Sequence, residues 1–382
     1  MKKILILHNK YKNIGGEDIA VYNEVNFLKK FYIVETLYFE NQIKNFFFEF
    51  FSLLFSNNRK SINILNDKIE KFKPDVVYVH NTWFKASLGT FRVIQEHKIE
   101  TIIKLHNFRY FCTSHLLSKN HLSENNFCFA CGYKPKRKRL FNKYFEDSLL
   151  KSFFVLIYGR KYLNILKKSN MKILVLTKFH KEFINKIPEF KSKIYVFPNY
   201  LEFNPDVNND KQNYVFYGGR ISKEKGINEL INAFQRAKLK NIILKIAGDG
   251  PLLNELKEKY EHFDNVEFIG LKSNQDVLKI MKNSLAVISA TRIYEGQPTL
   301  LCEASVLGVP SIFPTTGGIS EFFPSDYKLS FNQYDYDDLI NKLQLISDKN
   351  LMKKIGNENK DFIVSFLNEL RLKEKFGDIL ND

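Results

Sequence analysis

Cysteine, tryptophan and long apolar runs are scarce in this chain of 382 residues. Four cysteines do not make a disulfide framework, so a reducing compartment such as the cytoplasm is expected. No window approaches the roughly 20 apolar residues that a membrane-spanning helix needs. Only four apolar residues follow the opening Met1-Lys2-Lys3, too few for a signal peptide. These absences exclude an integral membrane protein and a disulfide-stapled secreted domain.

Acidic side chains are also scarce, but only in the first half of the chain. Residues 1–200 hold 35 Lys and Arg against 16 Asp and Glu, whereas residues 201–382 hold 23 against 26. All of the formal net charge of +16 therefore belongs to the first half. Overall, 44% hydrophobic and 26% charged residues describe an ordinary globular chain, which excludes disorder and collagen-like repeats.

Short apolar or β-branched runs alternate with longer helical patterns, which is typical of parallel sheets built from β-α-β units. The runs are Lys3–Leu7, Ile33–Tyr38, Asp75–His80, Thr101–His106, Lys172–Thr177, Lys193–Phe197, Tyr214–Tyr217, Ile242–Ala247, Val266–Gly270, Leu285–Ser289 and Ser311–Phe313. They predict an α/β fold of two doubly wound, Rossmann-like domains that face a central cleft.

The length favours two domains, since a single core stops growing at roughly 250–300 residues. We predict an N-terminal domain over residues 1–205 and a second domain over residues 206–360, because Asn and Asp interrupt two strand-like runs near this boundary. Residues 361–382 are predicted to be a C-terminal helix that packs back on the N-terminal domain.

Glycines follow the first predicted strand of each half, where doubly wound sheets bind ligands. Gly15 and Gly16 allow backbone N–H groups to approach an anion at a helix N-terminus, although a tight turn explains two such glycines at least as well. In the second half, Gly219 and Arg220 are followed by Lys225. A guanidinium that grips two oxygens and a nearby ammonium suit a diphosphate; the alternative is a solvated loop.

Two glutamates flank the predicted start of a helix after the run Leu285–Ser289. Glu295 is expected in the loop and Glu303 about one turn inside the helix. Free N–H groups of the first helical turn can hold a phosphate between the two carboxylates, which are natural acceptors for sugar and ribose hydroxyls. A structural carboxylate is the alternative for each glutamate alone. The other residues of this segment that we predict to bind substrate are Gly296, Gln297, Pro298, Thr299 and Leu300.

In combination these motifs resemble glycosyltransferase family 4. The residues that carry the resemblance in the second half are Gly219-Arg220, Lys225-Gly226, Gly248-Asp249-Gly250-Pro251, Glu295, Glu303, Gly317-Gly318 and Glu321. The first half is similar to one bacterial sub-group through His8-Asn9, Gly15-Gly16-Glu17-Asp18, His80-Asn81-Thr82 and Leu105-His106-Asn107-Phe108-Arg109. The resemblance implies the two-domain GT-B fold and transfer of a hexose-type sugar, with retention of configuration, from a UDP- or GDP-linked donor.

The resemblance also implies a role for each candidate residue. Arg220 and Lys225 would stabilise the diphosphate, Glu295 would hold donor-sugar hydroxyls and Glu303 the ribose. Gly15 and Gly16 would approach the phosphates or the acceptor, and His106 would contact the transferred sugar. The acceptor would be a lipid-linked glycan or oligosaccharide of a capsule, lipopolysaccharide or exopolysaccharide pathway. A GT-B relative with another reaction (a sugar-phosphate synthase, a phosphorylase or a non-catalytic sugar-binding protein) is the alternative.

No metal or cofactor is expected to take part in the reaction. Asp335-Tyr336-Asp337 is the only Asp-x-Asp sequence, and it is better explained as the charged start of a helix than as a metal-binding motif. A structural zinc is a weak prediction for Cys112, Cys128 and Cys131, since no fourth cysteine follows closely. Reduced thiols are the plainer interpretation.

Residues 134–172 concentrate basic side chains, interleaved with aromatic and aliphatic ones. This pattern predicts a surface that meets anionic lipid headgroups, which would make the protein peripheral on the inner face of the cell membrane. A solvated basic surface is an equally good explanation. Nucleic-acid binding fits the charge but leaves Glu295 and Glu303 unexplained, so no nucleic-acid partner is expected.

Overall fold

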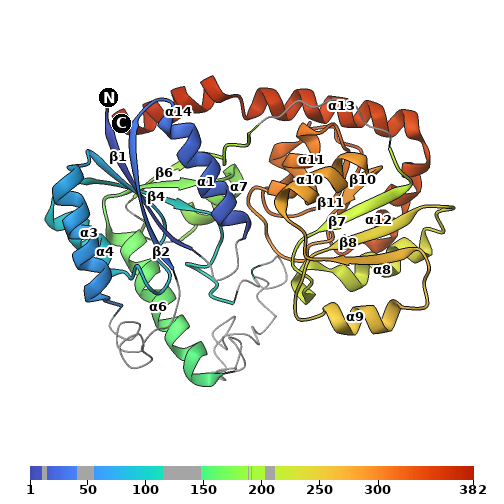
Figure 1. Ribbon diagram of the computed structural model, residues 1–382, viewed down its shortest axis with the longest axis horizontal. Helices are drawn as coiled ribbons and strands as arrows, with labels where there is room; N and C mark the ends of the chain where they lie inside the picture. Colours follow the sequence, from blue (N-terminus) through green and yellow to red (C-terminus); the bar gives the residue numbers. More distant parts are fainter. Residues whose placement is uncertain are drawn as a thin grey trace. The chain divides into compact units, whose positions relative to one another are not determined.

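The structure, a computed structural model, describes residues 1–10, 15–40, 56–114, 117, 148–187, 189–190, 192–202 and 211–382. The chain forms two compact units (Figure 1). Unit 1 comprises Met1–Glu202 and Glu369–Asp382, and unit 2 comprises Phe203–Asn368. The chain therefore leaves unit 1 once and returns to it for its last helix.

Unit 1 contains a parallel sheet with the strand order β2-β1-β3-β4-β5-β6 in its described residues. The order reverses between β1 and β3, and such a switch point is where doubly wound sheets bind ligands. The strands are β1 (Lys3–Lys10), β2 (Ile33–Glu40), β3 (Val76–Asn81), β4 (Glu100–Leu105), β5 (Lys172–Val175) and β6 (Lys193–Val196).

Helices cover both faces of this sheet, so its central strands β1, β3, β4 and β5 are largely buried, whereas the edge strands β2 and β6 are only half-buried. The helices are α1 (Gly16–Lys29), α3 (Arg59–Phe72), α4 (Gly89–Glu96), α6 (Leu149–Lys168), α7 (Lys178–Asn185) and α14 (Glu369–Asn381). Leu5 and Leu7 of β1 join one apolar cluster with α3, α4 and α6, whereas Ile4 and Ile6 join the opposite cluster with α1 and α14. This alternation follows from the two-residue period of a strand.

Unit 2 contains a second parallel sheet, with the order β12-β11-β10-β7-β8-β9 over residues 211–368. Its switch point lies between β10 and β7. The strands are β7 (Tyr214–Gly218), β8 (Ile243–Ala247), β9 (Val266–Gly270), β10 (Ala286–Ile288), β11 (Ser311–Thr315) and β12 (Ser330–Asn332). Every strand except β12, which has three residues, overlaps a run that the sequence predicted.

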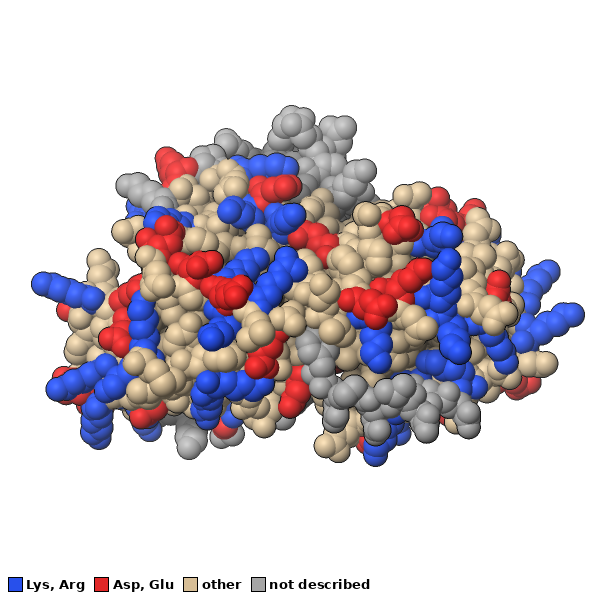
Figure 2. All heavy atoms as spheres, turned by 90° about the horizontal axis from the view of Figure 1, so that it is seen from above, with Lys and Arg blue, Asp and Glu red and all other residues tan. Residues whose placement is uncertain are grey.

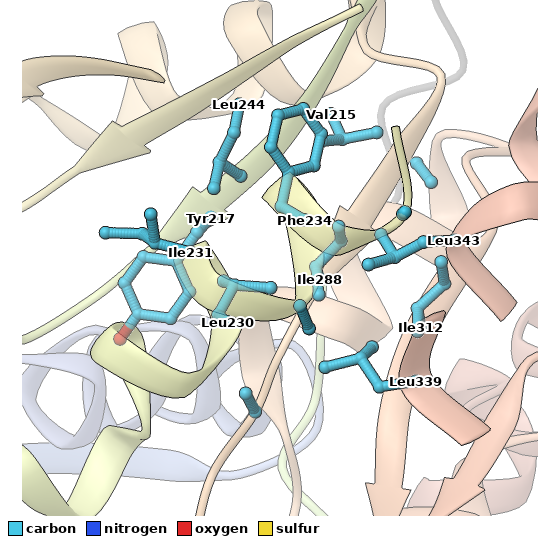
Figure 3. Close-up of a cluster of buried hydrophobic side chains, with 14 of the residues drawn as sticks. Val215, Tyr217, Leu230, Ile231, Phe234, Leu244, Ile288, Ile312, Leu339 and Leu343 are labelled. Carbon is cyan, nitrogen blue, oxygen red and sulfur yellow. The ribbon is translucent and has the colours of Figure 1, made fainter. Parts of the chain in front are cut away.

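The core of unit 2 forms where α8 packs on the sheet (Figure 3). Leu230, Ile231 and Phe234 of α8 meet Val215 of β7 and Leu244 of β8 in one buried cluster. The helices of unit 2 are α8 (Ile227–Arg236), α9 (Leu253–Tyr260), α10 (Asn274–Asn283), α11 (Thr299–Val306), α12 (Tyr336–Gln344) and α13 (Lys349–Phe366), with short 3₁₀ helices η1 (Lys223–Lys225), η2 (Ile319–Phe322) and η3 (Leu345–Ser347). The fold class is therefore the predicted one: α/β, with two Rossmann-like domains.

The tail of the chain is divided between the units. The helical pattern at residues 361–379 belongs to two helices, because α13 ends at Phe366 in unit 2 and α14 begins at Glu369 in unit 1. Leu372 and Phe376 of α14 are buried in a cluster with Tyr78 of β3. None of the described helices is long and apolar enough to cross a membrane.

Candidate functional site

The predicted site residues of unit 2 follow the two strands at its switch point. β7 ends at Gly218, so Gly219 and Arg220 follow it directly, and Lys225 ends the helix η1. Glu295 lies in the segment between β10 and α11. Because β7 and β10 are paired in parallel, their carboxyl ends meet at one edge of the sheet and bring these segments together.

Lys225 and Glu295 form an ion pair, with Nζ 2.5 Å from Oε1. The hydroxyl of Thr291, which is buried, donates to the same oxygen at 2.9 Å. Two donors therefore fix Oε1, and no described group bonds to Oε2. The carboxylate is held in one orientation, with one oxygen left to accept hydrogen bonds from a ligand.

Two glycines let the backbone of this site pack closely. Gly226 has φ of +69°, and a Cβ atom there would lie 2.1 Å from the carbonyl oxygen of Ala290. Gly317 has φ of +58°, and its Cβ would lie 2.2 Å from the carbonyl oxygen of Glu295. Side chains at either position would push the Glu295 segment away from Lys225, so these glycines set the geometry of the ion pair.

Arg220 is exposed, and its guanidinium makes no ion pair with the described residues. Its backbone is fixed instead: the hydroxyl of Tyr217 donates to the carbonyl oxygen of Arg220 at 3.0 Å. A cation on a fixed backbone, with its charge uncompensated, can accept an anionic ligand without first breaking a contact.

The first turn of α11 lies directly after the Glu295 segment. Gly296 and Gln297 lead into Pro298, which is the N-cap, and Thr299 and Leu300 are the first two helical residues. The first hydrogen bond within this helix runs from the N–H of Cys302 to the carbonyl oxygen of Pro298, at 2.9 Å. The N–H groups of Thr299 and Leu300 lie before that bond in the chain. A helix terminus of this kind attracts negative charge.

Glu303 lies one turn further along α11, where burial raises the pKa of its carboxyl to about 7. Its neighbours Cys302 and Ala304 are fully buried, and no described group donates a hydrogen bond to its side chain. A carboxylate that lacks a partner in such a setting gains from donors that a ligand brings.

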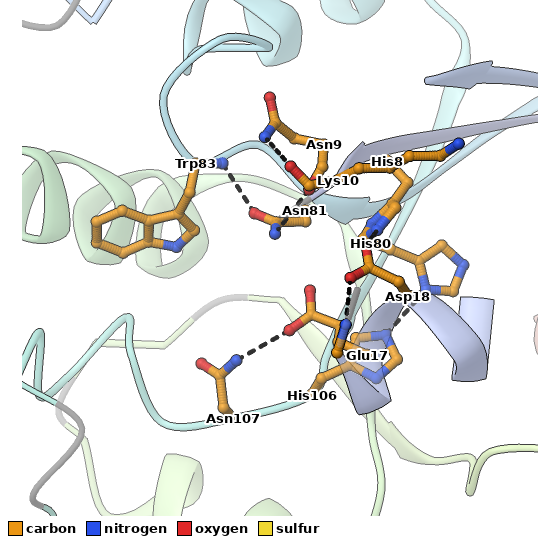
Figure 4. Close-up of polar contacts among 11 residues, drawn as sticks. His8, Asn9, Lys10, Glu17, Asp18, His80, Asn81, Trp83, His106 and Asn107 are labelled. Carbon is orange, nitrogen blue, oxygen red and sulfur yellow. Dashed lines mark hydrogen bonds and ion pairs between the residues drawn. The ribbon is translucent and has the colours of Figure 1, made fainter. Parts of the chain in front are cut away.

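In unit 1, the same dipeptide recurs near the carboxyl ends of three neighbouring strands (Figure 4). His-Asn occurs at the ends of β1 and β3 and directly after β4, as His8-Asn9, His80-Asn81 and His106-Asn107. The asparagines fix the loops. Asn81 accepts a hydrogen bond from the backbone of Trp83 at 2.8 Å, and Asn107 accepts one from Arg109 at 2.9 Å. The histidines consequently stand in a row across the switch point.

Each histidine has one partnered ring nitrogen. His8 donates from Nε2 to Asp18 Oδ1 at 2.8 Å, and His80 Nδ1 lies 2.9 Å from His106 Nε2. The second nitrogen of each ring is buried without a partner among the described residues. Burial, reinforced by neighbouring positive charge, holds the pKa of His80 and of His106 well below the ordinary value, so both rings are neutral.

Gly15 and Gly16 stand at the start of α1, with Gly15 as its N-cap. Among the described residues, a Cβ atom at Gly16 would meet nothing within 4 Å, and one at Gly15 only Asp18 at 3.9 Å. The packing of this described part of the chain therefore does not require glycine at either position. The acidic residues Glu17 and Asp18 occupy the first turn, and the N–H of Gly15 already donates to Asp18 at 2.9 Å.

A charged pair lies inside unit 1 beneath the histidines. Lys104 donates to Glu24 Oε2 at 2.5 Å, and Tyr78 donates to Oε1 at 2.5 Å. Lys104 and Glu24 have no solvent-exposed area. The carboxylate satisfies both donors, so the buried charges compensate each other.

The cysteine and basic-segment predictions lie largely outside the described residues. This is true of Cys128, of Cys131 and of residues 134–147. Cys112 is described: it is buried, and its Sγ lies 3.1 Å from Ser114 Oγ. In the view of Figure 2, basic and acidic side chains lie interspersed over the described surface. The Asp-x-Asp sequence does begin a helix, since the side chain of Asp335 caps α12 by accepting from the N–H of Asp338.

Four residues that hydrogen-bond in or next to these sites were not among the predicted site residues: Thr291, His80, Lys104 and Glu24. Thr291 and Lys104 do not belong to a recognisable sequence motif. The sequence of the helix that contains Glu24 does not indicate that this residue pairs with Lys104. The repeated His-Asn dipeptide was the available signal for His80, because it recurs at the ends of predicted strands.

The sequence of this chain is similar to those of known glycosyltransferases. Residues 201–362 match the model of the family "Glycosyl transferases group 1". The chain is 29% identical over 221 residues to the amylovoran biosynthesis glycosyltransferase AmsD of Erwinia amylovora, covering 55% of this chain and 62% of the relative. It is 26% identical over 143 residues to a UDP-Gal:alpha-D-GlcNAc-diphosphoundecaprenol alpha-1,3-galactosyltransferase of Escherichia coli, covering 37% of each. The alignments thus span less than two thirds of either relative.

Solved structures agree over the whole chain at low identity. Sucrose-phosphate synthase of Thermosynechococcus elongatus superposes with a TM-score of 0.71 at 14% identity, covering 100% of this chain and 98% of that one. Anabaena HepE in complex with UDP and glucose gives 0.67 at 14% identity, covering all of both chains. These likenesses concern the fold. Residues 201–362 therefore match the glycosyl transferases group 1 model, in a chain that shares its fold of two Rossmann-like domains with these structures.

Proposed function

We propose that this protein is a retaining glycosyltransferase that moves a hexose from a UDP- or GDP-linked donor to a lipid-linked or cell-surface glycan. The matched group 1 domain covers the described site of unit 2. The names of two relatives refer to amylovoran biosynthesis and to a galactosyltransferase acting on a diphosphoundecaprenol-linked sugar. A capsule, lipopolysaccharide or exopolysaccharide pathway is the context that agrees with both.

The observation that carries the proposal is the Lys225–Glu295 ion pair, at the sheet edge where Arg220 follows β7. The two cations would neutralise the donor diphosphate as charge grows on the leaving group, together with the N–H groups of Thr299 and Leu300. Oε2 of Glu295 would accept from donor-sugar hydroxyls. Because these cations supply the positive charge, we propose that the reaction needs no metal ion and no cofactor.

The donor nucleotide would extend to Glu303, whose carboxylate would accept hydrogen bonds from the ribose. Gly219, Gly296, Gln297 and Pro298 would line the donor through their backbones or by shaping the loop. This assignment follows from the burial of Glu303, because ribose hydroxyls supply hydrogen-bond donors that no described group supplies.

Unit 1 would receive the acceptor and contact the transferred sugar through His106. Gly15 and Gly16 were predicted to approach either the phosphates of the donor or the acceptor. The carboxylates of Glu17 and Asp18 stand in the same helical turn and would repel a phosphate. Acceptor hydroxyls suit this turn better, and the glycines leave room for them.

A panel of nucleotide-sugars tests the proposed activity directly. The full chain would be incubated with UDP- and GDP-linked hexoses, with and without short diphospholipid-linked sugars, and products would be detected by mass spectrometry. We expect one donor to transfer its sugar with the anomeric configuration retained. Binding of several donors with neither transfer nor hydrolysis would instead indicate a non-catalytic sugar-binding protein.

We further propose that the chain docks peripherally on the cytoplasmic face of the membrane. Helix α6 begins with three exposed apolar side chains, Leu149 (48%), Leu150 (57%) and Phe153 (47%), beside the exposed Lys151. Apolar side chains next to a cation suit an anionic lipid surface. We expect the full chain to sediment with phosphatidylglycerol vesicles. The double variant Leu150→Asp with Phe153→Asp should no longer sediment with them. Equal sedimentation of the variant would exclude this surface.

The pKa of Glu303 gives a pH-dependent prediction for UDP binding. Above pH 7 the carboxylate is ionised and accepts ribose hydrogen bonds, whereas below pH 7 it is protonated. We expect UDP affinity to fall about 10-fold from pH 8 to pH 6 through this group, and Glu303→Gln to remove that part of the fall. Isothermal titration calorimetry on both proteins measures it. The phosphate of UDP titrates in the experiments with both proteins. The difference between the two proteins in how steeply UDP affinity changes with pH therefore reports on Glu303 alone.

The same shift affects the stability of the free protein. The folded-state pKa of about 7 lies above the ordinary value of 4.5, so Glu303 makes the fold less stable as pH rises from about 4.5 to about 7. Glu303→Gln should therefore unfold at a higher temperature than the wild type at pH 8. Glu258→Gln, at an exposed position of α9, is the matched control. Parallel pH profiles for Glu303→Gln and wild type would contradict the assignment.

A further inference from the structure

The segment between β10 and α11 contains a buried hydroxyl that bonds to the Glu295 carboxylate. Thr291 is only 2% exposed, and its Oγ1 donates to Oε1 of Glu295 at 2.9 Å. The other oxygen, Oε2, has no partner among the described residues. The Glu295 side chain is 25% exposed, and Oε2 is not one of the buried unpartnered atoms of the described chain, so a ligand can reach it.

The backbone next to Thr291 is held from two sides. The N–H of Arg292 donates to the carbonyl oxygen of Glu224 at 2.9 Å, and the hydroxyl of Tyr334 donates to the carbonyl oxygen of Arg292 at 2.8 Å. The guanidinium of Arg292 also pairs with Glu229 of α8, at 2.7 Å. These contacts tie the segment to η1 and α8, so the position of the Thr291 hydroxyl does not depend on its acceptor.

The two donors to Oε1 differ in how firmly each is held. Lys225 has a long, flexible side chain that is 30% exposed, and its ammonium carries three protons. In the proposed function this ammonium also binds the donor diphosphate, so its contact with Glu295 is shared or lost when the donor arrives. The Thr291 hydroxyl is buried, has one proton and stands on a stiff β-branched side chain. It is therefore the donor that keeps the carboxylate oriented in the complex.

We propose that Thr291 is a positioning residue that holds the Glu295 carboxylate with Oε2 directed at the donor sugar, and that it thereby sets how strictly the protein distinguishes sugar epimers. The inference rests on the proposed function, in which Oε2 accepts from donor-sugar hydroxyls. Glu295 touches the substrate, and Thr291 acts only through it. A fixed acceptor disfavours an epimer whose hydroxyl points elsewhere, because the acceptor is then left unpaired, whereas an acceptor that rotates can follow either epimer.

Two substitutions at Thr291 separate hydrogen bonding from packing. Thr291→Val removes the hydroxyl but keeps the branched shape, and Thr291→Ser keeps the hydroxyl. The readout is the ratio of kcat/KM between UDP-glucose and UDP-galactose, or between GDP-glucose and GDP-mannose if the panel selects a guanine nucleotide. We expect Thr291→Val to reduce this ratio about 10-fold, the effect of one hydrogen bond to a charged group, and Thr291→Ser to retain most of it. Thr101→Val, in unit 1, is the matched control.

Binding of the free nucleotide distinguishes positioning from a general structural role. UDP or GDP has no sugar for Glu295 to contact, so its Kd in Thr291→Val, measured by isothermal titration calorimetry, should stay within about twofold of the wild type. A distorted site would weaken the binding of the nucleotide and of the nucleotide-sugar alike, and that result would overturn the inference.

The remaining outcomes are equally decisive. An unchanged epimer ratio in Thr291→Val, or a wild type that uses both epimers equally well, would overturn the inference. Should Thr291→Val not fold, Thr291→Ala removes the same hydroxyl, and an unchanged ratio there would count against it in the same way. Unchanged turnover in Glu295→Gln, or no transfer from any donor of the panel, would instead overturn the proposed function.

Discussion

Glu295→Gln is expected to lower kcat/KM for sugar transfer by about 10²–10³-fold, the usual effect of removing one preorganised electrostatic group. Glutamine fits the same space, but it removes the charge that pairs with Lys225 at 2.5 Å. The amide also offers a weaker acceptor to the sugar hydroxyls. Steady-state kinetics with the donor identified in the panel measure the loss.

The fold should survive this substitution. The backbone of Glu295 is held independently of its side chain, because Gly318 donates to its carbonyl oxygen at 2.9 Å. Glu258→Gln changes the same chemical group away from the site and should leave kcat/KM unaltered. Glu295→Gln with activity within twofold of the wild type would show that the carboxylate has no part in transfer.

The largest stability effect is expected at the buried pair of unit 1. Glu24→Gln leaves the ammonium of Lys104, which has no exposed area, without its counterion. Breaking a buried ion pair from one side typically costs about 3–5 kcal/mol. Lys104→Met alone should also destabilise the fold. The double variant Glu24→Gln with Lys104→Met should recover much of the loss, because no uncompensated charge remains.

Urea unfolding followed by tryptophan fluorescence measures these differences. Trp83 is the only tryptophan of the chain, and it is buried in unit 1, so its emission reports on that unit alone. A loss below about 1 kcal/mol in Glu24→Gln would contradict the interpretation. Equal losses in the single and double variants would indicate that packing, rather than charge, controls the stability.

The fold was predictable because each strand is a local signal. Runs such as Val266–Gly270 are rich in apolar and β-branched residues and end in a glycine, and the structure has a strand with those bounds. The strand β12 (Ser330–Asn332) was missed because it is short and polar at both ends. The break between α13 and α14 was missed because the apolar pattern continues across it, and only packing against unit 1 reveals it.

The two sites differ in how much of each the sequence discloses. The candidate residues of unit 2 lie in short motifs, and Glu295 and Glu303 are separated by one loop and one helical turn. The contacts of unit 1 join distant parts of the chain: Glu24 and Lys104 come from a helix and a strand with other strands between them in sequence. No periodicity predicts such a pair. Lys104 even interrupts an otherwise apolar run without any mark of its partner.

The return of the chain to unit 1 has a consequence for biosynthesis. The nascent chain completes the sheet of unit 1 long before α14 leaves the ribosome, because all of unit 2 is translated in between. Until then the apolar surface that Leu372 and Phe376 later cover faces water. Unit 2 is continuous in sequence and can fold as it emerges. Unit 1 therefore matures last although most of it is made first, and its nascent form is the stage most exposed to chaperones and proteases.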